Sequence, residues 1–192
     1  MSKKIIVAVT LGLLISGMGH SQTAVAPGDG TLSAAIAAAA SGDVLVLESG
    51  GLYTESTEAI LVIDKKIIFQ AADGAADRPI IQNLSAAAGS GSARPHLFLL
   101  KGGASITCTF IEFDGLEPDT SAFKATDNLF VLDPAVENAS IGHVMMDDCK
   151  IHRFTGKVID GGENKLDGKN MTTDTFIKIS YTHMTQPAIC SV

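Results

Sequence analysis

The sequence has 192 residues, of which 46% are hydrophobic and 18% are charged. This length suits one domain, and this balance excludes both a disordered tail and a bundle of membrane helices. Fourteen Lys and Arg against 21 Asp and Glu give a net charge of −7, which argues against nucleic acid or an anionic membrane as the main partner.

Residues 1–21 have the pattern of a secretory signal peptide. Lys3 and Lys4 precede an apolar run over residues 5–19, and polar residues follow at once. Small residues near its end, the last of them Ser21, predict cleavage before Gln22. A permanent membrane anchor is the alternative, although the run is shorter than the roughly 18 residues that a span needs. We therefore expect a secreted, periplasmic or cell-surface protein without stable membrane insertion after this segment is removed.

An alanine-rich segment from Leu32 to Ala40 predicts a helix. Leu32 and Ile36 fall on one narrow apolar stripe, so the helix should lie across the end of a larger structure. Asp29 or Thr31 can accept its free N-terminal amide groups, and Ser41-Gly42 should end it.

After Asp43 the pattern changes to short apolar runs separated by Gly, Asp, Asn and Ser. Continuous Val, Ile and Leu without Asn-Gly hairpin turns favour parallel strands that stack on their own kind. The predicted strands are Val44–Leu47, Ile60–Ile63, Ile67–Phe69, Ile80–Ile81, Leu97–Leu100, Ile106–Phe113, Leu129–Leu132, Val144–Met146 and Phe176–Ile179.

Three consecutive segments share the order strand, Gly or Asp turn, strand, turn, strand. They run from Pro95 to Gly115, from Asn128 to Gly156 and from Val158 to Met184. Neighbouring copies can stack about 4.8 Å apart and share parallel ladders. The pattern predicts an all-β fold: a right-handed single-stranded parallel β-helix, a solenoid, with an N-terminal capping α-helix.

Cys108, Cys149 and Cys190 are equally spaced, and the first two both open a Cys-x-Φ-x-x-Phe pattern, where Φ is apolar. An odd count without CxxC pairs argues against a disulfide framework, a zinc site or a redox motif. We interpret them as buried thiols at one position of the strand repeat, with chance spacing as the alternative.

The segment from Gly28 to Glu55, with its Gly-Asp-Gly-Thr-Leu start, resembles the entrance of pectate-lyase-like parallel β-helix proteins, where an N-terminal helix caps the first coil. Residues 63–71 and 79–81 resemble the next coil, and residues 110–115 resemble a Φ-x-Φ-Asp-Gly strand end. The sequence is most similar to the chondroitinase B and alginate lyase group and to related secreted Bacteroidetes domains of unknown function. The resemblance covers roughly residues 28–184 and concerns the fold, which does not fix function.

The resemblance also implies a chemistry for the lyase members of that group. A basic residue removes a proton next to a uronate carboxylate, often with Ca²⁺ to offset the carboxylate charge. Those groups lie on middle and late coils, whereas this chain reaches about five or six coils and ends without a polar closing segment. We therefore expect residues 22–192 to be the N-terminal portion of a β-helix domain, truncated before further coils or a C-terminal domain. No catalytic residue is carried over by motif.

The segment from Cys149 to Arg153 contains the candidate catalytic side chains. Strand alternation buries Cys149 and Ile151 and turns Lys150 and His152 outward, with Arg153 near the bend. Lys150, His152 and Arg153 could form a base and a carboxylate clamp. An ordinary solvated strand face is the alternative.

The loop from Asp160 to Asn170 is rich in the oxygen ligands that Ca²⁺ takes. Its spacing fits no EF-hand or Gly-rich calcium repeat, so a plain Asn/Gly/Asp turn is the alternative. The candidate metal ligands are Asp160, Glu163, Asn164 and Asp167.

Two functions of different class follow from these patterns. The first is a secreted β-helix domain without catalysis, carbohydrate-binding or structural, with a polysaccharide or other glycan as its partner. The second is the N-terminal part of a polysaccharide lyase that acts by β-elimination on uronate-containing glycans and whose catalytic coils are missing here. The acidic net charge favours the first for this chain unless Ca²⁺ bridges to the glycan.

Overall fold

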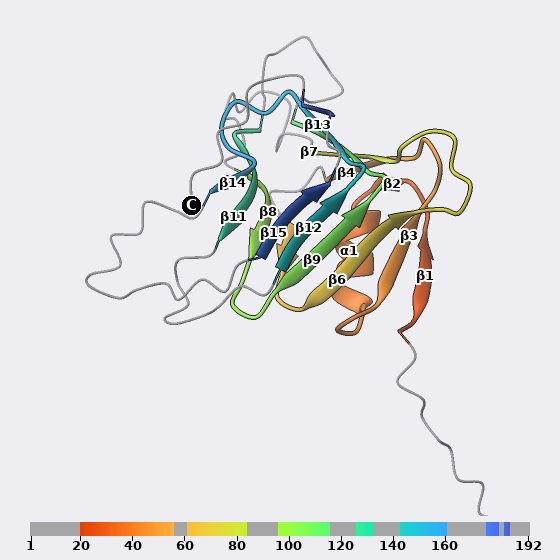
Figure 1. The fold of residues 1–192 in the computed structure, drawn as a ribbon. Coiled ribbons are helices and arrows are strands. Elements are labelled where there is room, and N and C mark those ends of the chain that lie inside the picture. The colour runs from red at the N-terminus through yellow and green to blue at the C-terminus, as the bar shows by residue number, and fades with distance from the viewer. Residues whose placement is uncertain are drawn as a thin grey trace, which may run out of the picture.

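The computed structural model describes residues 20–55, 61–83, 96–115, 126–132 and 143–160, and the backbone of residues 176–180 and 183–184. These residues form a stack of parallel strands with one helix at its N-terminal end (Figure 1). The predicted signal peptide lies almost entirely outside the described residues. In the part of the chain that is described, no helix has the length and apolar character needed to cross a membrane.

Three parallel sheets, named here A, B and C, run along the stack. Sheet A consists, in order, of β1 (Gln22–Val25), β3 (Val44–Leu47), β6 (Lys66–Ala71), β9 (Ser105–Thr109), β12 (His143–Asp147) and β15 (Phe176–Ser180). Sheet B consists of β2 (Gly28–Asp29), β4 (Leu52–Glu55), β7 (Ile80–Asn83), β10 (Glu112–Asp114), β13 (Lys150–His152) and β16 (His183–Met184). Sheet C consists of β5 (Leu61–Ile63), β8 (His96–Leu100), β11 (Asn128–Leu132) and β14 (Ile159–Asp160).

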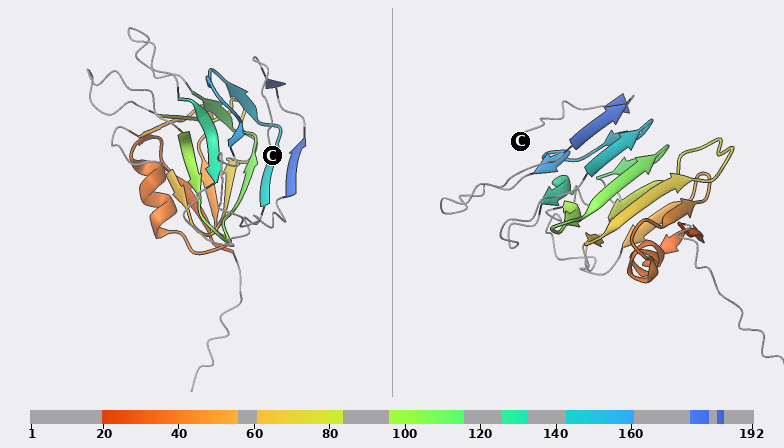
Figure 2. Two further views of the ribbon diagram at one scale, coloured as in Figure 1. Left: turned by 90° about the vertical axis from the view of Figure 1, so that its left-hand side faces the viewer. Right: turned by 60° about the horizontal axis from the view of Figure 1, so that its bottom comes forward.

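Each coil of the chain adds one strand to every sheet in turn. In the first coil the helix α1 (Thr31–Ala38) takes the place that a sheet C strand has in later coils, and it contacts β5. The strands therefore lie side by side from the helix end to β15 (Figure 2). Parallel strands joined by crossovers of this kind wind to the right. The predicted right-handed parallel β-helix with an N-terminal helix is confirmed, and the six strands of sheets A and B agree with the expected number of coils.

The interior of the stack is filled by inward side chains from all three sheets. Phe69 of sheet A, Phe113 of sheet B and Phe98 and Phe130 of sheet C are fully buried. The Phe98 ring lies 5.2–6.1 Å, centroid to centroid, from the other three rings. Because strands of all three sheets contribute to this one core, the apolar runs among the described residues correspond to strands.

The apolar stripe of α1 packs as predicted, but the helix ends differ from the prediction. Leu32 and Ile36 are 1% and 4% exposed within the core. The C-terminal carbonyl groups of the helix are bound by Lys65, whose Nζ donates to the oxygen atoms of Ile36 (3.3 Å) and Ala39 (3.0 Å). A cation at a helix C-terminus is favoured by the helix dipole.

The N-terminal cap of α1 is a correction to the sequence prediction. The N-cap residue is Gly30 in the left-handed conformation, with φ 69°, and not Asp29 or Thr31. The amide of Ser33 instead donates to Glu55 Oε1 at 3.0 Å, so the acceptor comes from the next coil. This carboxylate is buried with its residue 2% exposed. The two ends of the helix are thus held by side chains that follow it in the sequence.

The predicted strand Ile106–Phe113 is wrong as a single element. It forms two strands, β9 and β10, in two different sheets. The chain turns between them at Phe110, which has a left-handed φ of 56°. Aromatic residues rarely adopt this conformation, so composition does not reveal the turn.

Cys108 and Cys149 are buried free thiols, as predicted, whereas Cys190 lies outside the described residues. The prediction that they share one position of the repeat is wrong. Cys108 lies opposite Met146 in sheet A, whereas Cys149 comes just before β13 in sheet B. The two cysteines are 41 residues apart, while stacked residues in these coils are 38 apart. Burial raises the pKa of Cys149 to about 11 and raises that of Cys108 as well, which leaves both thiols protonated and unreactive.

Candidate functional site

The candidate residues of β13 lie on the outer face of sheet B. Cys149 and Ile151 are 1% and 5% exposed, whereas the side chains of Lys150 and His152 point outward, so the predicted alternation is confirmed. Arg153 follows at a left-handed φ of 61° and is 45% exposed at its side chain. The structure thus brings all three sequence candidates to one end of one strand.

Two of these basic side chains, Lys150 and His152, share a carboxylate of the preceding coil. Glu112 of β10 lies opposite Lys150, and its Oε1 accepts from Lys150 Nζ at 3.0 Å and lies 2.7 Å from His152 Nε2. Burial alone would raise the pKa of Glu112, but the hydrogen bonds and charges of Lys150 and His152 outweigh it and lower that pKa. Glu112 is therefore ionised and holds both side chains in place.

The third side chain, Arg153, is held by a second carboxylate of β10. Arg153 binds Asp114 through both Nε, at 2.7 Å from Oδ1, and Nη2, in the bidentate geometry that guanidinium groups favour. Gln82 of β7 donates from Nε2 to Oδ2 of Asp114 at 3.1 Å. Asp114 is 3% exposed, so this network links three coils below the surface.

The glycine after Asp114 has a structural reason to be there. A Cβ on Gly115 would lie 2.5 Å from the carbonyl oxygen of Arg153, which is too close for any other residue. The Gly115 amide also donates to the carbonyl oxygen of His152 at 3.0 Å. In the Asp-Gly pair noted in the sequence, Asp114 therefore binds the Arg153 side chain, and Gly115 leaves space for the Arg153 backbone.

A neighbouring group at the corner between sheets A and B was not among the sequence candidates. Arg78 Nη2 lies 2.6 Å from Asp148 Oδ1, and its Nε donates to the backbone oxygen of Asp148 at 3.2 Å. The same guanidinium group lies 4.4 Å from the ring centroid of Phe110. An Arg 70 residues before its carboxylate partner leaves no local sequence signal, so only the coil register reveals the pair.

The candidate calcium ligands are only partly described. Asp160 lies at the end of β14, where its Oδ1 accepts from Lys157 Nζ at 3.1 Å, and Glu163, Asn164 and Asp167 lie outside the described residues. Among the residues that the structure describes, no group of three or more His, Cys, Asp or Glu could hold a metal ion. The metal site therefore stays a prediction.

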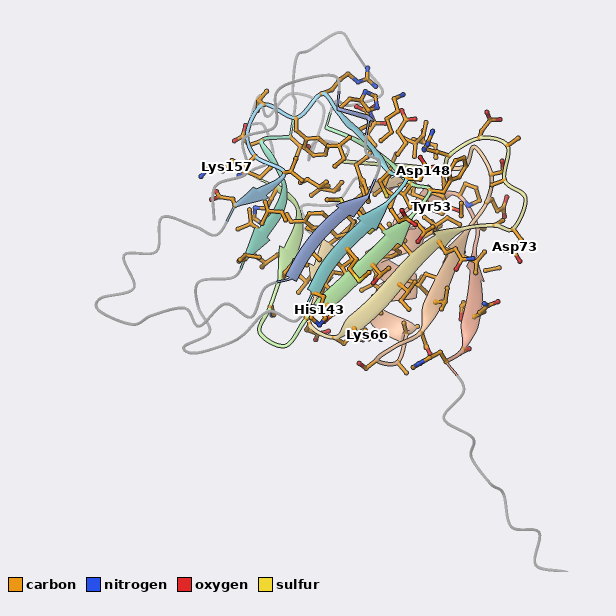
Figure 3. The ribbon with its side chains drawn as sticks, in the orientation of Figure 1. Tyr53, Lys66, Asp73, His143, Asp148 and Lys157 are labelled. Carbon is orange, nitrogen blue, oxygen red and sulfur yellow. The ribbon has the colours of Figure 1, made fainter. Side chains whose placement is uncertain are left out.

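Asp160 also affects a histidine on the same sheet. Burial lowers the pKa of His96, and the charge of Asp160 partly opposes this effect. In Figure 3, Lys157 lies well apart from Asp148, which comes two residues before β13.

The geometry of the sheet B cluster is suited to binding. Lys150 Nζ, which donates to Glu112, can still donate hydrogen bonds to a ligand from its other N–H groups. The cluster has two fixed cations, two carboxylates and a histidine, so its charge is nearly balanced. Such a surface can bind hydroxyl and carboxylate groups of a ligand that lies across the coils.

Comparisons with known proteins agree with the fold. No family model matches the chain, and the curated proteins contain no match to it. Solved structures that are similar to the chain include two forms of the PL6 family alginate lyase AlyGC. The first is AlyGC itself, with TM-score 0.58 and 23% identity. The second is an arginine-to-alanine mutant of AlyGC, with TM-score 0.60 and 24% identity. They cover 96% and 95% of this chain.

The likeness to AlyGC agrees with the expected fold, because the strands of this chain also form a parallel β-helix. The chain spans only 22% of the length of each lyase chain. At this identity the likeness concerns the fold, and activity has to be argued from the site.

Proposed function

We propose that this chain is a secreted polysaccharide-binding segment of a β-helix protein, and that it binds glycan through the outer face of sheet B. The observation that carries the proposal is the cluster formed by Glu112, Asp114, Lys150, His152 and Arg153, which spans two neighbouring coils. The likeness to alginate lyases supports a polysaccharide as the ligand class.

The position of the cluster along the stack also supports this proposal. In the register of sheet B, Leu52 and Ile80 of the early coils lie in the same outward row as Glu112 and Lys150. In this row, charged groups therefore replace apolar ones from the fourth coil onward. A glycan that lies along the stack would meet donors and acceptors on these later coils and on any coils that follow them.

Binding of anionic and neutral polysaccharides tests the proposal. Affinity electrophoresis of the full chain in gels that contain alginate, chondroitin sulfate, pectate or a neutral glucan, each with and without Ca²⁺, should show retardation by at least one uronate polymer. Lys150→Ala should weaken that retardation roughly tenfold, because one charge-assisted contact contributes about 1.4 kcal/mol.

Lys157→Ala is the matched control, because Lys157 also pairs with a carboxylate, Asp160, but lies on sheet C. This variant should bind as the unmodified chain does. Absence of retardation by every polymer, or equal weakening by the Lys157 and Lys150 replacements, would overturn the proposal.

The N-terminal part of a polysaccharide lyase is the second candidate function, and the fold likeness to alginate lyases favours it. Lys150 and Arg153 are bound to carboxylates, so we expect no β-elimination by this chain alone. The ultraviolet absorbance of unsaturated uronate products checks this with the same polymers. Product above background would make His152 and Lys150 the first residues to replace, and a catalytic base should affect kcat more than KM.

A further inference from the structure

A hollow with a mixed polar and apolar lining lies on a different part of the surface, at the corner where sheet A turns into sheet B. It has a volume of about 240 Å³ and lies between the loop after β6 and the turn after β9. Gln70, Asp73, Thr109 and Phe110 are among its lining residues. Figure 3 shows Asp73 on this loop, on the opposite side of the view from Lys157.

The residue at the turn after β9 is unusual for its backbone conformation. Phe110, two residues before β10, has a φ of 56°. Asp148 stands at the equivalent place in the next coil, two residues before β13, and has a φ of 46°. Asp tolerates the left-handed region, whereas a bulky aromatic residue is strained there. The chain thus places an aromatic side chain at a position that its backbone disfavours, beside the hollow.

Besides Phe110, the hollow is lined by alanines and a glycine of the loop and by the side chains of Gln70, Asp73 and Thr109, none of which is positively charged. Thr109 has a hydroxyl group, and Gln70 Nε2 contacts Asp73 Oδ1 at 3.4 Å, a long hydrogen bond that a ligand can replace at little cost. Arg78 lies over the Phe110 ring, but its charge is balanced by Asp148 at 2.6 Å. The field in the hollow is therefore set by Asp73, which disfavours an anionic ligand.

An aromatic ring beside a carboxylate, an amide and a hydroxyl group matches the chemistry of a sugar. The C–H groups on one face of a pyranose carry partial positive charge and pack against an aromatic ring, while its hydroxyl groups bind carboxylate and amide groups. We propose that this hollow binds one neutral pyranose unit. This site is separate from the cationic cluster of sheet B and does not rest on the function proposed for it.

Amide chemical shifts of the full chain test the proposal. Methyl β-glucopyranoside, methyl α-mannopyranoside and methyl β-galactopyranoside are titrated, with methyl β-glucuronide as the charged counterpart. At least one neutral glycoside should shift the Gly74 and Thr109 amide signals in a saturable manner, and the glucuronide should bind at least several-fold more weakly. No shift with any neutral glycoside, or equal binding of the glucuronide, would overturn the proposal.

Phe110→Asn separates a ligand-binding role from a structural one, because Asn accepts the left-handed backbone. We expect an affinity at least roughly tenfold lower without a decrease in melting temperature. Retained affinity, with or without a decrease in melting temperature, would assign the ring to packing against Arg78 alone and overturn the proposal.

Asp73→Asn provides a second variant, at an exposed loop residue. It should weaken binding of the neutral glycoside and reduce the discrimination against the glucuronide. Unchanged discrimination would contradict the role given to Asp73. Lys150→Ala should leave this site unaffected, so failure of the sheet B proposal and failure of this one are distinguishable.

Discussion

The outer faces of sheets A and B are built on the same stacked backbone but are held together differently. One outward row of sheet A consists of Val44, Ile68, Thr107 and Met145, which are half-buried and uncharged. The later coils of sheet B instead carry carboxylates and cations that bind one another. Apolar neighbours in a ladder tolerate replacement one at a time, whereas each charge on sheet B depends on a specific partner.

Replacing Asp114 should have the largest effect on this comparison. Asp114→Ala leaves Arg153 and the buried Gln82 without their shared acceptor, and we expect a loss of about 3 kcal/mol in the free energy of unfolding. Urea denaturation measures this loss, with Thr107→Ala on sheet A as the matched control. Equal losses in the two variants would show that the two faces do not differ in the way described.

A smaller, pH-dependent effect is expected at Glu112. Its pKa is lowered in the folded protein, so its contribution is complete above the ordinary pKa of a glutamic acid and disappears as the pH falls through the lowered value. Glu112→Gln should therefore cost about 1 kcal/mol at neutral pH and almost nothing at an acidic pH below the lowered pKa of Glu112. Denaturation curves of both proteins between these pH values check the sign, and a difference that grows with acidity would refute it.

The smallest effect is expected on sheet A. Thr107→Val keeps the β-branched shape and extends the apolar row between Ile68 and Met145, so stability should change by less than about 0.5 kcal/mol. Thermal unfolding followed by circular dichroism is sufficient to measure it. A loss above about 1 kcal/mol would indicate that the Thr107 hydroxyl group has a partner as specific as those on sheet B.

The sequence predicted those features that depend on neighbouring residues. Continuous apolar runs correspond to strands because each strand turns alternate side chains into the one core, and the outward direction of Lys150 and His152 follows from the same alternation. The turn inside residues 106–113 was missed because Phe110 is not a turn-forming residue, although its backbone is left-handed.

The partners of the outward side chains could not be predicted, since they depend on the register between coils. Lys150 and Glu112 are 38 residues apart, and loops of varying length separate the coils, so no fixed period identifies the pair. The equal spacing of the cysteines suggested a period of 41 residues. In the structure, Cys108 instead lies opposite Met146, so this period does not give the register of the coils. The helix caps were missed for the same reason, because they come from other coils.

The way in which α1 is held has a consequence for the order of folding. An isolated helix of eight residues is marginal in water, and here its two ends find their partners only at Glu55 and Lys65. During synthesis, therefore, the two ends of the helix gain these partners only after the second coil and the start of the third have left the ribosome. Later coils can then add to the stack in the direction of translation.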